Sequence, residues 1–340
     1  MAGAKDFSAV NTKISGLSKN LLTYKDYQSI LNMSPREILD LLKKKEFIES
    51  TDFQELDYLS VHLKRVLIQK MRAMGYFLGN RYKTLMDLII DRYEIDDVKK
   101  AIRNIFNRNM DISEESFVIR TDFFKKVIEK TSIIDFIDSL SEESYYSYLR
   151  NYKEIEDEKL LFYLEMSLDR FHYSDIFKFC EKLDKKSSQK AKSLFGTIID
   201  LKNLVWIYRA KKFYQVDDML IYNYSIFRGL KFGPEELLKL SRMDLDSFVD
   251  SIFKMDYGFL FGEDKSSDLY MSLEIDRFLY DRFDDYLKSN GFHIGKVLGY
   301  ILVYEFQIKD IMVIMQGKEL NMEEESLEDY LIGYGERRFI

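Results

Sequence analysis

The residues that could carry out chemistry in this chain are few and scattered. The histidines, His62, His172 and His293, have no second histidine or cysteine at the spacing of a metal site, so we expect single buried or exposed histidines rather than zinc ligands. Neither the phosphate-binding pattern G-x-x-x-x-G-K-[ST] nor the nucleophile pattern G-x-S-x-G occurs. Acidic runs such as 323–325 lack apolar or glycine-rich surroundings and are typical of a solvated face. The sequence therefore predicts no catalytic residues, no cofactor and no metal.

Charged residues that recur along the chain are better candidates for a role. Three lysines, each preceded by an aliphatic residue, lie 103 and 107 residues apart, at Lys99, Lys202 and Lys309. An Asp-Arg-Phe triplet occurs at 169–171 and again at 276–278. The favoured interpretation is that these charges tie helices together within one domain, and the alternative is that they bind a partner. The candidate interface residues are Lys99, Lys202, Lys309, Arg170 and Arg277.

The segments that carry these charges have the pattern of amphipathic helices. We predict helices over 93–110, 198–214 and 304–320, because apolar residues recur at helical spacing around each lysine. Ser34-Pro35 with Glu37, and Gly233-Pro234 with Glu236, are typical helix starts. Both prolines of the chain would then occupy one repeat position. No segment shows sustained strand alternation, so we predict an all-α fold.

The recurrence predicts a threefold domain organisation. Its period of about 105 residues exceeds that of tetratricopeptide or HEAT solenoids. We therefore expect three similar helical domains, with boundaries at 1–110, 111–217 and 218–340.

Composition restricts the class of protein. The net charge of −7 and the pI near 5.3 argue against a nucleic-acid-binding protein, which needs a basic surface. Cys180 is the only cysteine, so no disulfide framework exists and a buried thiol is expected. The first residues lack the apolar core of a signal peptide, and no stretch reaches the length of a spanning helix. We expect a cytosolic protein that does not insert into a membrane.

Further segments to consider together are Val10-Asn11, Leu21-Leu22, the "DYQSIL" helix, "DLKNLVWIYRAKKF" and "EFQIKDIMVIMQGK". In combination they resemble a known family, the rotor-cap subunit of V-type and A-type rotary ATPases. This subunit is called C in bacteria and archaea and d in eukaryotes. The likeness covers essentially the whole chain in length and repeat number. The chain departs from the pattern where the second repeat lacks the capping proline and the first lacks Asp-Arg-Phe.

The resemblance implies a fold, a function and partners. The fold would be three helical domains around a pseudo-threefold axis, forming a funnel. The chain would be a non-catalytic rotor subunit that passes torque between ATP hydrolysis or synthesis and proton or sodium transport. Its partners would be the central-stalk subunits of the D and F type and the c/K proteolipid of the membrane rotor ring, without nucleic acid and without direct membrane insertion. It would lie on the cytoplasmic face of the membrane.

Two other functions stay open from the residues alone. One is an all-α repeat scaffold or adaptor with another cytosolic partner. The other is an enzyme whose site is assembled between domains from scattered acids and tyrosines.

Overall fold

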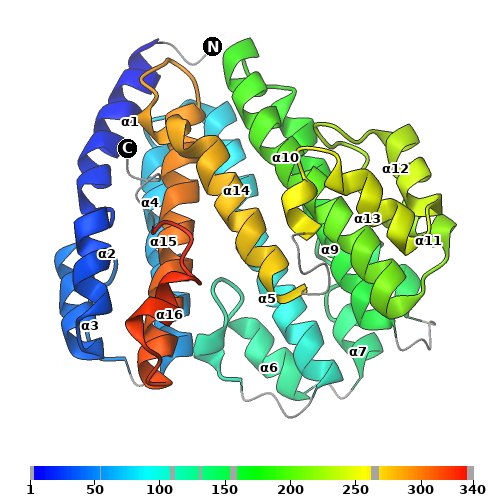
Figure 1. The fold of residues 1–340 in the computed structure, drawn as a ribbon, viewed down its shortest axis with the longest axis horizontal. Coiled ribbons are helices and arrows are strands. Elements are labelled where there is room, and N and C mark those ends of the chain that lie inside the picture. The colour runs from blue at the N-terminus through cyan, green and yellow to red at the C-terminus, as the bar shows by residue number, and fades with distance from the viewer. Residues whose placement is uncertain are drawn as a thin grey trace. The chain divides into compact units, whose positions relative to one another are not determined.

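Helices are the only regular secondary structure in the part of the chain that the structure describes. The computed structural model describes residues 4–53, 55–107, 112–129, 132–153, 159–261 and 268–334, and within these ranges there is no strand. Figure 1 shows the helices in chain order. The prediction of an all-α fold is therefore confirmed.

The chain divides into two compact units. Unit 1 comprises residues 1–86 and 264–340, and unit 2 comprises residues 87–263. The boundary falls inside the long helix α5 (Asn80–Phe106). The two units are defined by compactness, whereas the three domains predicted from the sequence, 1–110, 111–217 and 218–340, are defined by repetition. The three domains therefore stay a prediction.

Unit 1 joins the two ends of the chain around helix α15. Its helices are α1 (Ala4–Leu17), α2 (Tyr24–Leu31), α3 (Pro35–Lys44), α4 (Leu56–Gly75), the start of α5, α14 (Asp268–Lys288), α15 (Gly295–Glu319) and α16 (Glu324–Glu328). Helix α15 is apolar on nearly all sides and is mostly buried, as expected of a central core helix. Its neighbours are α14, α4 and α1. At Gly299, an added Cβ would lie 2.3 Å from the backbone nitrogen of Leu287, so the glycine permits the close approach of α14 and α15.

Unit 2 is built around a second pair of long helices. These are α9 (Leu160–Cys180) and α10 (Lys185–Arg209), which pack against each other. The shorter helices are α6 (Asp122–Glu129), α7 (Ile133–Asp138), α8 (Tyr146–Leu149), α11 (Asp218–Tyr224), α12 (Pro234–Arg242) and α13 (Leu245–Phe253). Cys180 is a free, buried thiol at the end of α9, as predicted.

The order of elements recurs three times along the chain. Each time, a pair of short helices precedes a hairpin of two long helices. The two helices of a pair begin 11 residues apart, at residues 24 and 35, at 122 and 133, and at 234 and 245. The hairpins are α4–α5, α9–α10 and α14–α15. Pro35 begins the second helix of its pair, whereas Pro234 begins the first. The expectation that the two prolines share one repeat position is therefore wrong; chain order places Tyr24 opposite Pro234.

The three segments predicted as helices are helical over their described residues except Asn107 and Leu320, which follow the last residues of α5 and α15. Residues 93–106 lie in α5, residues 198–209 lie in α10, and residues 304–319 lie in α15. The second segment closes with a π-helical turn, Ala210–Tyr214. Residues 108–110 lie outside the described residues.

Candidate functional site

The recurring lysines pair with the recurring aspartates. Lys202 Nζ lies 3.3 Å from Asp169, and Lys309 Nζ lies 2.6 Å from Asp276. In both pairs the lysine follows the aspartate by 33 residues, so the contact joins equivalent positions of the two long-helix hairpins. The favoured interpretation from the sequence, that these charges tie neighbouring helices together, describes both pairs.

Lys99 makes its ion pair in unit 2, with the same aspartate as Lys202. Its Nζ lies 2.5 Å from Asp169, and both side chains are only 9% exposed. Burial of Asp169 opposes its ionisation, but the two ammonium groups outweigh burial and lower the pKa of this carboxyl to about 2. The neighbouring His172 is buried, and burial together with the Arg92 charge lowers its pKa to about 3. The imidazole is therefore neutral at physiological pH.

The recurring arginines hold backbone carbonyl groups. Arg170 donates to the carbonyl oxygen of Asn223, at the end of α11. Arg277 donates to the carbonyl oxygens of Asp329 at 2.7 Å and of Leu331 at 3.2 Å. The acceptors follow their arginines by 52 to 54 residues, so the two arginines act alike in the two units. The structure brings Lys99 and Lys202 together at Asp169, next to Arg170 in the chain, and it places Lys309 at Asp276, next to Arg277 in the chain. Whether any of them contacts a partner stays a prediction.

A further set of repeated contacts was not foreseen from the sequence. Two residues before each recurring lysine stands a buried polar side chain, at Asp97, Asp200 and Gln307. We call these three residues the anchors. Each one binds the backbone just before the first helix of a short pair.

The anchors bind backbone groups in buried or half-buried surroundings. Asp97 accepts hydrogen bonds of 2.7–2.9 Å from the N–H groups of residues 118, 119 and 120. Asp200 accepts from the N–H groups of residues 231 and 232, and a side chain on Gly229 would begin 2.0 Å from its carboxylate. Gln307 accepts from the N–H of Leu22 at 2.9 Å and donates to the Leu22 carbonyl at 2.8 Å. Because such bonds fix the entry to α6, α12 and α2, the anchors hold each short pair to a long helix.

Asp310 performs a related task at the C-terminal end of unit 1. It accepts hydrogen bonds from the N–H groups of Ile332 and Gly333, at 2.7 and 2.9 Å, and from the hydroxyl of Tyr27 at 2.7 Å. Tyr334 stacks on Tyr24 of α2 at 5.3 Å. One buried carboxylate therefore joins α15, α2 and the segment 331–334.

We expect the stability of unit 1 to increase as the pH falls from about 7 to 5, through Asp310. Burial raises the pKa of Asp310 to about 6, although the bonds from Ile332, Tyr27 and Gly333 act in the opposite direction. The folded state then binds this proton more tightly than the unfolded chain, in which an aspartate has a pKa of about 3.9, so lowering the pH favours folding. The measurement is urea denaturation of the wild type and of Asp310→Asn at several pH values. The wild type should gain stability relative to the variant between pH 7 and 5; a constant difference would contradict the assignment.

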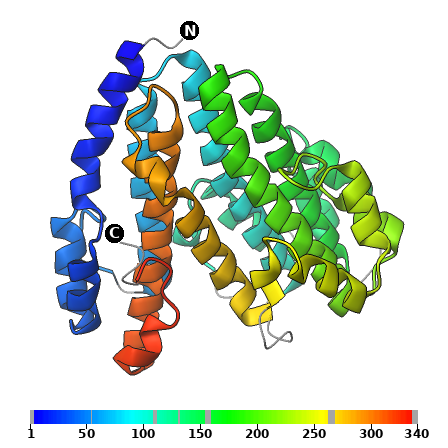
Figure 2. The same cartoon turned by 45° about the horizontal axis from the view of Figure 1, so that its top comes forward.

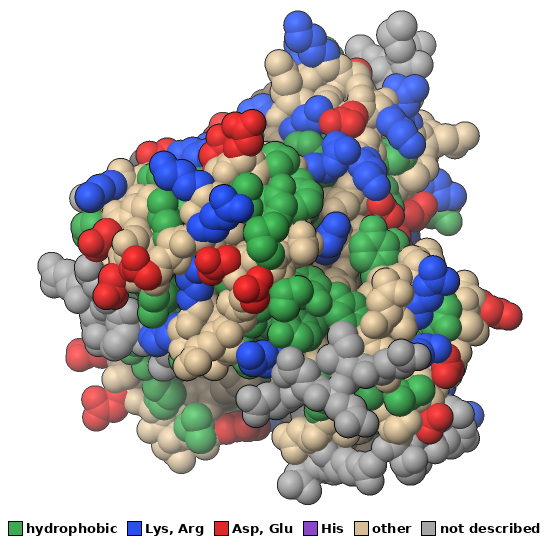
Figure 3. Space-filling view, turned by 90° about the vertical axis from the view of Figure 1, so that its right-hand side faces the viewer, with side chains coloured by type: hydrophobic (Ala, Val, Ile, Leu, Met, Phe, Trp, Pro, Cys, Tyr) green, Lys and Arg blue, Asp and Glu red, His purple; other side chains and the backbone are tan. Residues whose placement is uncertain are grey.

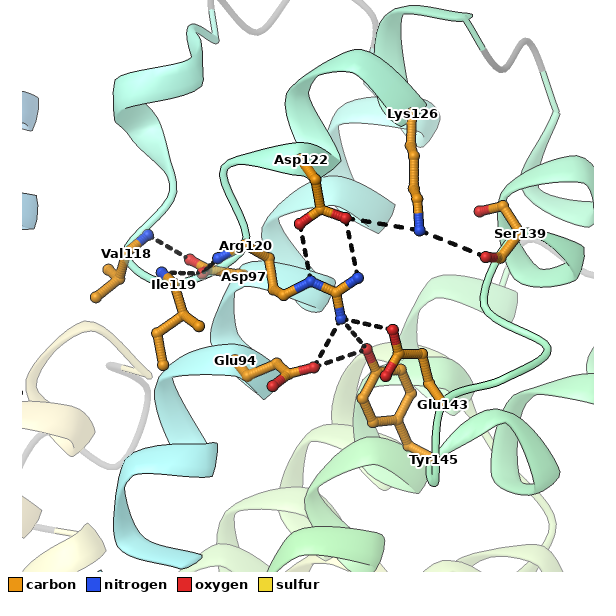
Figure 4. A network of polar contacts seen from close by, with 10 residues as sticks. All are labelled: Glu94, Asp97, Val118, Ile119, Arg120, Asp122, Lys126, Ser139, Glu143 and Tyr145. Carbon is orange, nitrogen blue, oxygen red and sulfur yellow. Dashed lines mark hydrogen bonds and ion pairs between the residues drawn. The ribbon is translucent and has the colours of Figure 1, made fainter. Parts of the chain in front are cut away.

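Arg120 is the centre of a polar network in unit 2 (Figure 4). Its guanidinium contacts Glu94 of α5 at 2.8 Å, Asp122 of α6 at 2.9 Å and Glu143 at 2.7 Å. Lys126 adds a second cation, 3.6 Å from Asp122. With Asp97 holding the backbone of residues 118–120, this network fixes the start of α6 against α5.

The contacts of these clusters pair charged side chains with each other and with backbone groups. The carboxylates of Glu94, Asp122 and Glu143 each face the Arg120 guanidinium, as Figure 4 shows. Among the described residues no group of three or more His, Cys, Asp or Glu could hold a metal ion. Burial raises the pKa of the Cys180 thiol to about 12, so it is not poised as a nucleophile. None of the helices in the described part of the chain combines the length and the apolar composition that crossing a bilayer requires.

Large apolar side chains are exposed at several places. Figure 3 shows one face, on which hydrophobic side chains lie between basic and acidic ones. The most exposed in unit 2 are Phe213, Phe253 and Met219, and in unit 1 they are Tyr76, Leu320 and Phe292. Exposed aromatic residues are the side chains that protein interfaces favour.

Comparison with known proteins gives one family. A family model described as ATP synthase (C/AC39) subunit matches residues 10–330. The C subunit of the A-type ATP synthase of Methanosarcina acetivorans is 23% identical over 344 residues, covering 97% of this chain and 94% of that protein. Its counterpart in Methanosarcina mazei is 22% identical with the same coverage, and the counterpart in Methanocaldococcus jannaschii is 20% identical, covering 92% and 87%.

Proposed function

Because the chain belongs to the ATP synthase (C/AC39) subunit family of the rotary ATPases, we propose that it is the non-catalytic rotor subunit that links the central stalk to the membrane rotor ring. In this role it transmits torque between ATP hydrolysis or synthesis and ion transport. The observation that carries the proposal is the family match over residues 10–330, with relatives aligned along nearly their whole length.

The described residues support a mechanical role. A torque-transmitting subunit has to resist deformation, and closely packed helices do so. The anchors and the Arg120 network tie short helices to long ones through buried or half-buried polar contacts. Three domains, 1–110, 111–217 and 218–340, arranged as a funnel would let one chain surround a shaft.

The proposal includes the partners and the location. The stalk would be made by subunits of the D and F type, and the ring by the c/K proteolipid. The chain would be peripheral, on the cytoplasmic face of the membrane, without inserting into it. Its charge of −7 agrees with protein partners rather than nucleic acid.

Affinity purification of the tagged chain from its own cells, in mild detergent, tests this proposal. We expect the catalytic head, the stalk subunits and the ring proteolipid to co-purify in fixed ratio. Co-purification with an unrelated cytosolic complex would favour the scaffold or adaptor function instead. ATP turnover by the isolated chain would contradict the non-catalytic assignment.

A further inference from the structure

The hairpin turn between α4 and α5 is basic in an otherwise acidic protein. Residues 58–86 contain six Lys or Arg residues and no Asp or Glu, whereas the whole chain carries a net charge of −7. Three of the six lie at or beside the turn and are exposed, namely Arg72, Arg81 and Lys83. These three have no ion-pair partner among the described residues. Their charge is therefore not neutralised within the described part of the chain.

Aromatic side chains project from the same turn. Tyr76 is 83% exposed and Phe77 is 42% exposed. The residues on either side, Gly75 and Leu78, are buried, so the turn is held in place while its aromatic side chains face solvent. Exposure of two adjacent large aromatic rings to water is unfavourable for an isolated protein. Such a pair is typical of the side chains that a protein interface buries.

The turn between α14 and α15 lies at the same end of unit 1. Helix α1 contacts both turns: Phe7 meets Tyr82 of α5 at 5.1 Å between ring centroids, and Asn11 donates to the Gly291 carbonyl at 3.2 Å. Figures 1 and 2 both show this turn, in orange, beside the start of α1. It adds Phe292, which is 58% exposed. The nearby acid Asp284 is paired with Lys288, and Asp285 is exposed.

We propose that this end of unit 1 docks onto an acidic surface of another protein subunit of the rotary ATPase. We call it the aromatic–basic tip, and its residues are Arg72, Tyr76, Phe77, Arg81, Lys83 and Phe292. The inference rests on the proposed function for the existence of such a partner, and it adds which surface is used and the partner's chemistry. Tyrosine and arginine are enriched at the centres of protein interfaces. The unpaired cations favour an acidic partner, because complementary charge speeds encounter and fixes orientation.

Charge reversal and aromatic removal test the docking surface separately. One variant carries Arg72→Glu, Arg81→Glu and Lys83→Glu, and a second carries Tyr76→Ser and Phe77→Ser. The matched control reverses three exposed cations of unit 2, through Lys239→Glu, Arg242→Glu and Lys254→Glu. The control changes the net charge by the same amount. Thermal unfolding of each purified variant establishes that it is folded.

The readout is the concentration of each purified chain that half-saturates a complex depleted of this subunit. We expect at least tenfold weaker binding for both tip variants, little change for the control, and binding of the wild type that weakens as salt rises. Equal binding by tip variants and wild type would overturn the docking surface alone. A wild type that joins no rotary complex would overturn both this inference and the proposed function.

A second experiment, with vesicles, distinguishes a lipid partner from a protein partner. Sedimentation with protein-free vesicles rich in phosphatidylglycerol measures direct contact of the same variants with an anionic surface. Vesicle binding that is lost in the tip variants, with unchanged binding to the depleted complex, would overturn the proposal in favour of a lipid partner.

Discussion

Removing this subunit from a reconstituted rotary ATPase should abolish ATP-driven ion transport, while the catalytic head continues to hydrolyse ATP. The reason is mechanical: if the chain joins the shaft to the ring, the shaft turns without the ring when the chain is absent. Hydrolysis should survive because, in the proposed function, the chain connects the shaft to the ring and supplies no residue to the catalytic head. The expected loss of transport is complete, since no second connection would pass the torque.

The measurement compares ATP hydrolysis and ion uptake in vesicles with and without the subunit. Adding back the purified wild-type chain is the control, and it should restore transport. Transport that persists without the subunit would contradict the torque-transmitting function. Hydrolysis that disappears from the detached head would show that the chain acts on catalysis itself.

The long helices could be predicted from the sequence because their information is local. Apolar spacing around Lys202 and Lys309 identified α10 and α15, and the Ser34-Pro35 start identified α3. The prediction that the two prolines occupy one repeat position was wrong because a capped start with proline can begin either helix of a short pair. Pro35 begins the second helix of its pair, and Pro234 begins the first. A division into two units could not be predicted, since it depends on how distant segments pack.

The ion pairs could be predicted from the sequence more readily than the contacts of the anchors. Asp169 and Lys202 could be singled out because the same residue types recur about 107 residues later. The anchors Asp97, Asp200 and Gln307 change residue type and bind backbone N–H groups, which any sequence supplies. The signal available was a single polar residue between apolar neighbours, as at Asp200 between Ile199 and Leu201. That signal indicates a buried polar group but not its partner.

The substitution Asp169→Asn should destabilise unit 2 strongly, by about 3–5 kcal/mol, because it leaves the buried Lys99 without a counter-charge. Lys99 and Asp169 are each 9% exposed at the ion pair, so water cannot replace the lost carboxylate. The matched control is Asp276→Asn, at the equivalent position of the next hairpin. Its partner Lys309 is 52% exposed, so the loss there should be about 0–1 kcal/mol. Urea denaturation of both variants gives the comparison, and equal losses would contradict the role of burial.

Two further measurements separate the charge from packing. The pKa of Asp169 is lowered to about 2 in the folded state, against about 3.9 in an unfolded chain. A lowered carboxyl pKa means that the contribution is fully present above about pH 4 and is lost as the pH falls toward 2, so the difference between wild type and Asp169→Asn should shrink in that window. Adding Lys99→Met to Asp169→Asn removes the unpaired buried cation and should recover part of the lost stability. A double variant no more stable than Asp169→Asn would indicate that the carboxylate matters through its contact with Lys202 instead, since that lysine is the other cation within 3.3 Å.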